Sequence, residues 1–191
     1  MSYIGPKVHI DLEQLAQNYQ LLSNEVGNAP VMATVKANGY GHGAVEVSKV
    51  LEKEGTRYLA VFTLEEGIEL RDAGITTDIL IYSKLDPNRL SEAVTHNLTL
   101  NVSSFDDLQA LKTHQGGSIK VHLKIDTGMT RLGVPLEQAE AFLEKANQIH
   151  NKYNKIIVSG GVVEKKALYS EALAIEKYLI DNFGIPKNKI I

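Results

Sequence analysis

The sequence predicts an α/β fold with parallel strands, in the form of a partial TIM-type (β/α) barrel followed by an α/β tail. Two observations support this. Short apolar runs that resemble buried strands recur about every 20 to 27 residues over the first two thirds of the chain, and amphipathic stretches fill the gaps between them. The chain has 191 residues, whereas a complete eight-stranded barrel typically needs about 250. We therefore expect the barrel to be incomplete.

The expected elements follow one another in a regular order. A helix begins at Asp11, because Gln14 and a helical spacing of leucines follow it. Strand-like runs then lie at 31–36, 58–62, 78–82, 98–102 and 119–125. Helix starts are indicated by Thr63 with Glu66, Asp86 before Pro87, Ser104 with Asp107, and Pro135. Strands separated by single helices form parallel sheets, so the pattern fits both a barrel and an open doubly wound sheet.

Composition narrows the classes of function. The formal net charge is −3 with the basic residues spread along the chain, so we expect neither nucleic acid nor an anionic membrane as partner. The chain has no cysteine, which excludes disulfides and thiolate metal sites, and we expect no metal. The start resembles no signal peptide and no apolar run is long enough to span a membrane, which favours a cytoplasmic location and a small-molecule partner.

The first motif is the segment from Val35 to Gly43, which follows the apolar run at 31–34. Lys36 stands where a strand meets a glycine-rich turn, and an amine held at such a strand end can form a Schiff base with an aldehyde cofactor. Tyr40 offers a hydroxyl donor suited to a phosphate. The alternative is a solvated lysine beside an Asn-Gly turn.

The second motif follows the fifth predicted strand. It places Lys124, Asp126 and Arg131 together with two glycines at the exit of a buried run. A guanidinium can hold a carboxylate or phenolate oxygen in a fixed geometry. A solvated strand end is the alternative for any one of these charges.

Both motifs resemble the signatures of the alanine racemases, and the likeness covers roughly residues 5 to 134. The resemblance implies a barrel domain that binds pyridoxal 5'-phosphate. It also implies that Lys36 attaches the cofactor, Tyr40 touches its phosphate, and Arg131 bonds its phenolic oxygen. Lys124 matches a lysine that orients that arginine and is often carbamylated in the family.

The remainder departs from the family pattern, so we divide the chain into a racemase-like barrel portion at 1–134 and a divergent tail at 135–191. The family's later site residues and C-terminal domain find no match, which makes the racemase portion look truncated. The tail predicts a strand at 155–158, a Ser159-Gly160-Gly161 turn, a helix from Ser170 and a strand from Lys189. Residues 150–191 weakly resemble the front of YdcF-like domains, which suggests a composite chain. The turn fits either an anion cradle or a tight strand exit.

The resemblance implies a pyridoxal-phosphate-dependent amino-acid racemase, converting L-alanine to D-alanine for cell-wall synthesis, and it allows a homodimer. Lys36 would exchange a proton on one face of the substrate, and a tyrosine of the partner subunit on the other. Because this chain matches only the lysine, we expect the chain alone to be poorly active or inactive. The alternatives are a non-catalytic α/β binding module of vestigial or composite origin, and a nucleotide-binding module built on the Ser159–Gly161 turn.

Overall fold

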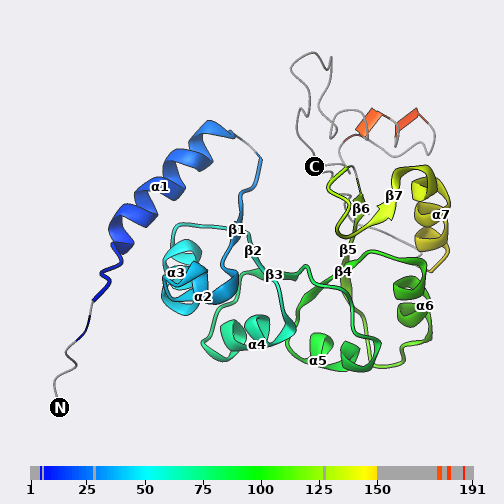
Figure 1. Ribbon diagram of the computed structural model, residues 1–191, viewed down its shortest axis with the longest axis horizontal. Helices are drawn as coiled ribbons and strands as arrows, with labels where there is room; N and C mark the ends of the chain where they lie inside the picture. The colour runs from blue at the N-terminus through cyan, green and yellow to red at the C-terminus, as the bar shows by residue number, and fades with distance from the viewer. Residues whose placement is uncertain are drawn as a thin grey trace. The chain divides into compact units, whose positions relative to one another are not determined.

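The protein is described by a computed structural model (Figure 1). The structure describes residues 5, 7–27, 29–126 and 128–149, and residues 176, 177, 180, 181 and 187 of the tail. The chain divides into two compact units, Met1–Ser83 and Lys84–Ile191. Each unit is treated by itself below.

Most of the predicted tail lies outside the described residues. This holds for the strand at 155–158, the Ser159–Gly161 turn and the strand from Lys189. Of the helix predicted from Ser170, residues 176, 177, 180 and 181 are described, and all four are helical.

The first unit alternates helices with three parallel strands. Its elements are α1 (Leu12–Glu25), β1 (Met32–Thr34), α2 (Lys36–Tyr40), α3 (Ala44–Lys53), β2 (Tyr58–Val61), α4 (Leu64–Asp72) and β3 (Asp78–Ile81). β2 lies between β1 and β3, with Ala60 opposite both Thr34 and Leu80. The predicted parallel pairing is confirmed here, and the strand ends agree with the prediction to within one or two residues.

The core of this unit is formed by apolar residues from the strands and from the helices that cover them. Leu59 of β2, Ile79 of β3 and Leu70 of α4 are each 0% exposed. Parallel strands carry helices on their faces, so their residues are largely buried and read as continuous apolar runs. This explains why the strand positions were readable from the sequence.

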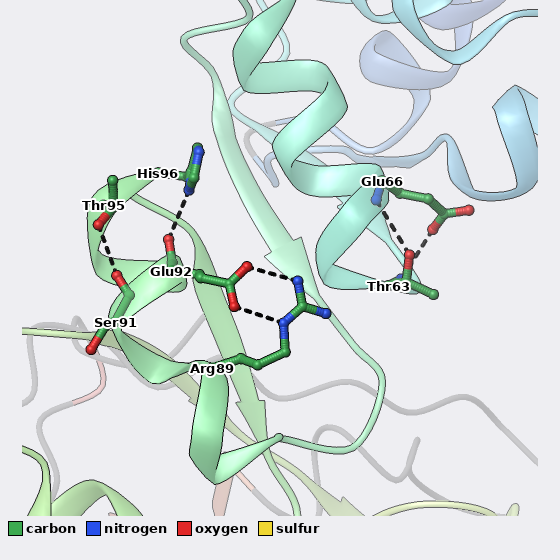
Figure 2. A network of polar contacts seen from close by, with 7 residues as sticks. All are labelled: Thr63, Glu66, Arg89, Ser91, Glu92, Thr95 and His96. Carbon is green, nitrogen blue, oxygen red and sulfur yellow. Dashed lines mark hydrogen bonds and ion pairs between the residues drawn. The ribbon is translucent and has the colours of Figure 1, made fainter.

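The helix starts follow the predicted caps. The Asp11 carboxylate accepts a hydrogen bond from Gln14 N at 2.9 Å, and α1 begins at the next residue. At the start of α4 the Thr63 hydroxyl accepts from Glu66 N at 3.3 Å, while the Glu66 carboxylate accepts from Thr63 N at 3.0 Å (Figure 2). This reciprocal pair is a capping box.

A carboxylate organises the loop at the start of β3, which is the end of the strand remote from Lys36. Glu52 of α3 accepts hydrogen bonds from the backbone N–H and hydroxyl groups of Thr76 and Thr77, at 2.7 to 2.9 Å. Burial by itself raises the pKa of Glu52, but these four hydrogen bonds outweigh it and the pKa is lowered. Glu52 is therefore held as a carboxylate that joins α3 to the start of β3.

Glu52→Gln is expected to lower the free energy of unfolding at pH 7 by about 1–2 kcal/mol, because several hydrogen bonds to a charged but partly solvated acceptor are weakened. Since the folded pKa is the lower one, this contribution is fully present above the unfolded pKa of about 4.3 and is lost as the pH falls through the folded pKa. Urea unfolding of both proteins at pH 7 and below pH 4 measures the difference. Glu46→Gln, in an exposed pair with Lys49 on the same helix, is the control and should change stability by less than about 0.5 kcal/mol. A Glu52 effect that does not shrink in acid would contradict the assignment.

The second unit continues the alternation. Its elements are η1 (Pro87–Arg89), α5 (Leu90–Thr95), β4 (Thr99–Val102), α6 (Phe105–Thr113), β5 (Lys120–Leu123), β6 (Ile125–Asp126), β7 (Val134–Pro135), η2 (Leu136–Gln138) and α7 (Ala139–Ile149). β4 pairs in parallel with β5, and β6 with β7. Arg89 and Glu92 form an ion pair with two hydrogen bonds of 2.8 Å at the start of α5 (Figure 2).

The strand predicted at 119–125 is wrong in its extent, because it is divided at Lys124. Lys124 N donates to Val102 O at 2.8 Å, whereas Lys124 O accepts from Val134 N at 3.0 Å. The backbone therefore changes its hydrogen-bond partner at this residue, from Val102 of β4 to Val134 of β7. No helix within the described residues is long and apolar enough to cross a membrane.

Candidate functional site

Lys36 lies two residues beyond the end of β1, directly after the buried Val35. The predicted strand at 31–36 is shorter in the structure, where β1 ends at Thr34. Val35 is 2% exposed and its N–H still donates to Ala60 O at 2.9 Å, after which the chain turns at Lys36. Lys36 is thus placed at the carboxyl end of a parallel strand, where (β/α) barrels carry their catalytic groups.

The residues after Lys36, which make up the rest of α2, form a left-handed turn and not a regular α-helix. Ala37, Asn38, Gly39 and Tyr40 have φ values of 50°, 54°, 61° and 54°. Three of these are not glycine, and each such residue costs roughly 1–2 kcal/mol relative to the right-handed conformation. Glycine also suits position 39 sterically, since a Cβ there would lie 3.3 Å from Ala44 N, a tight contact. The sequence indicated a glycine-rich turn at this place but not its left-handed backbone conformation.

Hydrogen bonds hold this turn at both ends. Ala37 N donates to the Glu66 carboxylate at 2.6 Å, and the Asn38 side chain accepts from Ala44 N at 2.9 Å at the start of α3. His42 Nδ1 lies 3.0 Å from Gly39 O, so this histidine is engaged locally. Strain of this kind persists where the surroundings fix it, and it is concentrated at functional sites.

Three aromatic rings surround the Lys36 amine. Its Nζ lies 5.8 Å from the ring centre of Tyr40, 5.9 Å from that of Phe62 and 5.5 Å from that of Tyr82. These distances are within the range of cation–π interactions. Phe62 and Tyr82 also contact each other edge to face, with ring centres 5.5 Å apart. Lys36 and Tyr40, both predicted as site residues, are therefore brought together.

Phe62 and Tyr82 were not among the predicted site residues, yet the sheet register could have found them. Ala60 lies opposite Thr34 and Leu80. Two residues after these three positions, just beyond the strand ends, the chain has Lys36 after β1, Phe62 after β2 and Tyr82 after β3. All three follow the last buried residue of a predicted strand, so a search for large side chains at equivalent strand ends would have identified the rings.

The second predicted motif lies in the second unit. The Lys124 ammonium donates to Ile125 O at 3.1 Å, and the Arg131 side chain is exposed. Asp126 organises the loop that carries Arg131, because its carboxylate accepts from Thr130 N at 2.9 Å and Gly128 N at 3.0 Å. These backbone hydrogen bonds, that of Thr130 first, lower the pKa of Asp126.

Glycine ends this loop for a steric reason. Gly133 has a φ of 117°, and a Cβ at this position would lie 2.7 Å from Asp126 N. The loop therefore closes back onto the strand β6 from which it started. It presents a guanidinium, a planar group that binds a carboxylate with two parallel hydrogen bonds and can also donate to a phenolate oxygen.

These groups define what the site residues can do chemically. Lys36 supplies a primary amine, Tyr40 a hydroxyl, and Phe62 and Tyr82 flat apolar faces, while Arg131 supplies a planar cation. No cluster of three or more histidine or carboxylate groups suited to a metal occurs within the part of the chain that the structure describes. Within the first unit, the amine, the hydroxyl and the aromatic faces are the groups expected for an aldehyde-bearing aromatic ligand with an anionic group.

Comparison with known proteins places the chain in a family. The sequence profile described as "Alanine racemase, N-terminal domain" matches residues 10–160. The chain is 41% identical over 148 residues to "Alanine racemase 1" of Caldanaerobacter subterraneus subsp. tengcongensis, which corresponds to 74% of this chain and 38% of that protein. The chain thus spans well under half the length of this relative.

Solved structures of alanine racemases are also similar to this chain. The alanine racemase from Corynebacterium glutamicum superposes with a TM-score of 0.71 at 32% identity, covering 78% of this chain and 44% of that chain. The alanine racemase from Oenococcus oeni gives a TM-score of 0.73 at 30% identity, covering 92% of this chain and 53% of that chain. These neighbours are TIM-barrel domains, which confirms the barrel over the open sheet. The chain belongs to the alanine racemase family.

Proposed function

We propose that the protein is a pyridoxal-phosphate-dependent amino-acid racemase, with alanine as its substrate and Lys36 as the residue that attaches the cofactor. One observation supports this above the others. The Lys36 amine stands at the end of β1, among three aromatic rings and beside a strained glycine turn, within a chain that matches the N-terminal domain of alanine racemases.

The residues present fit this cofactor. The Lys36 amine can condense with the aldehyde carbon, forming a carbon–nitrogen bond and releasing one water. Tyr40, 60% exposed, has its hydroxyl available to a phosphate, and the neighbouring glycines allow a ligand to approach the backbone. Phe62 and Tyr82 offer flat apolar faces to an aromatic ring. We assign the cofactor's phenolic oxygen to Arg131, with Lys124 as the residue that orients it.

When bound, pyridoxal phosphate withdraws electrons from the substrate's Cα and so makes its proton removable. Lys36 would accept and return the proton on one face of that carbon. Racemisation also needs a proton donor or acceptor on the opposite face, and the family resemblance assigns this to a tyrosine of a partner subunit. The proposal therefore includes a homodimer. We also propose that the protein acts in the cytoplasm.

Titration of the purified chain with pyridoxal phosphate tests the proposal. We expect the cofactor's absorption band to shift away from that of the free aldehyde, and saturation at about one cofactor per chain. Incubation of the loaded protein with L-alanine in deuterated water should exchange the Cα proton. An unshifted spectrum would favour the rival proposal, a non-catalytic α/β binding module.

Arg131→Lys is expected to weaken cofactor binding by roughly tenfold or more, because the ammonium keeps the charge but loses the planar, two-pronged donor. The Kd from absorbance titration and the position of the visible band measure the effect. Arg57→Lys, at an exposed position before β2, is the control and should leave both unchanged. An Arg131 variant with the wild-type spectrum and affinity would refute the role assigned to this residue.

A further inference from the structure

Glu66 contacts two separate segments of the first unit through one carboxylate. Its Oε2 accepts from Phe62 N at 2.7 Å and from Thr63 N at 3.0 Å. Its Oε1 accepts from Ala37 N at 2.6 Å. The same side chain therefore binds the peptide group that follows Lys36 and the backbone of Phe62, one of the rings around the Lys36 amine.

The helix cap accounts for the bonds of Oε2 but not for the bond of Oε1 to Ala37 N. At the start of α6 the equivalent residue is Asp107, which accepts from Ser103 N at 2.7 Å, while its own N–H donates to the Ser104 hydroxyl at 3.1 Å. Ser103 precedes the N-cap of α6 as Phe62 precedes that of α4. An aspartate is thus sufficient for the bond to the residue before the N-cap, whereas Glu66 also accepts from the N-cap residue, Thr63. The additional methylene of Glu66 is what allows its second oxygen to reach Ala37.

The bond to Ala37 lies where the backbone is strained. Ala37 is the first of the consecutive residues with positive φ. Its N–H donates to Glu66. The side chain of the next residue, Asn38, accepts from Ala44 N and so joins the turn to the start of α3. Charge-assisted hydrogen bonds of this kind are short and about twice as strong as neutral ones. Glu66 therefore stabilises the conformation from which the Lys36 side chain extends.

We propose that Glu66 is a positioning residue for Lys36: by binding Ala37 N and Phe62 N together, it fixes the Lys36 amine relative to the rings of Phe62 and Tyr82. The inference rests on the proposed function, because it assigns Glu66 to the attachment of the cofactor at Lys36. Glu66 does not touch the cofactor in this account. It acts through the backbone on either side of the site.

Three variants of the full chain separate positioning from helix capping. Glu66→Asp keeps the charge and a side chain long enough to accept from Phe62 N, as Asp107 does from Ser103 N, but is too short for Ala37. Glu66→Gln keeps the length but replaces one acceptor oxygen with an NH₂ donor. Thr63→Ala removes the hydroxyl that accepts from Glu66 N and leaves the Glu66 carboxylate with its three backbone donors, so it is the matched control for weakened capping.

The first measurement is the rate at which Lys36 is labelled by pyridoxal phosphate followed by borohydride, read by peptide mass mapping. A displaced catalytic group can cost about 10²-fold in rate, so we expect labelling to slow by roughly 10- to 100-fold in Glu66→Asp and Glu66→Gln. Thr63→Ala should stay within about threefold of the wild type. Wild-type rates in Glu66→Asp, or equal slowing in Thr63→Ala, would overturn the proposal.

The second measurement is hydrogen–deuterium exchange at the Ala37 amide, which needs no cofactor. Exchange should quicken in both Glu66 variants and remain near the wild-type rate in Thr63→Ala. Should wild-type Lys36 fail to label, the proposed function would fall. Faster exchange at Ala37 in Glu66→Asp would then still support the anchoring by Glu66, whereas unchanged exchange would overturn it as well.

Discussion

Changing Lys36 to alanine is expected to abolish covalent attachment of pyridoxal phosphate and to reduce Cα proton exchange by at least about 10²- to 10⁴-fold, the usual contribution of a positioned acid–base group. The side chain supplies both the amine that attaches the cofactor and the base for one face of the substrate. Absorbance titration and deuterium incorporation into alanine measure the two losses separately.

Lys36→Arg is the matched control, because arginine keeps a cation near the rings of Tyr40, Phe62 and Tyr82 but stays protonated and cannot condense with an aldehyde. We expect it to fold like the wild type and to show the same loss of attachment. If Lys36→Ala retained the shifted cofactor band, another amine would have to carry the cofactor.

The largest effect on stability is expected for Leu59→Ala. Leu59 is 0% exposed and lies on β2, between the other two strands of the first unit. Truncating a buried leucine removes its apolar contacts and leaves a cavity, at a cost of about 2–5 kcal/mol. Urea unfolding gives the change in free energy, with Leu21→Ala as control because Leu21 is 63% exposed on α1. A loss below about 1 kcal/mol for Leu59→Ala would mean that this strand does not form the core.

The sequence was informative wherever local chemistry decides structure. Asp11 and Thr63 begin helices because their side-chain oxygens accept from the first free N–H groups, and such caps depend on residues only three apart. The strands β2 and β3 were recognisable because helices cover parallel strands and make them largely apolar, whereas β4 and β5 also contain polar residues such as Asn101 and His122. Lys36 and Tyr40 could be paired as site residues because both belong to the Val35–Gly43 motif that resembles the alanine racemase signature.

Features that depend on distant partners were not predicted. Glu66 could be read as a helix cap from its distance to Thr63, but its bond to Ala37 joins residues 29 positions apart. The left-handed turn after Lys36 includes Ala37 and Tyr40, whose own preferences oppose positive φ. The division of the fifth predicted strand at Lys124 likewise depends on Val102 and Val134, which no local pattern reveals.

The site residues of the second unit remain a prediction. Asp126 shapes the loop that carries Arg131 through Thr130 N and Gly128 N. The roles of Arg131 and Lys124 toward a cofactor rest on the family resemblance, and the Arg131→Lys titration tests the first of them directly.

Every role proposed for the first unit depends on attachment of the cofactor at Lys36. The most direct test of this attachment is to incubate the purified chain with pyridoxal phosphate, reduce with borohydride, digest, and locate the added mass by peptide mapping. We expect a single dominant label on the peptide that contains Lys36, formed at less than one equivalent of cofactor and absent from Lys36→Arg. Label distributed over exposed lysines such as Lys49 and Lys53, with no preference for Lys36, would contradict it.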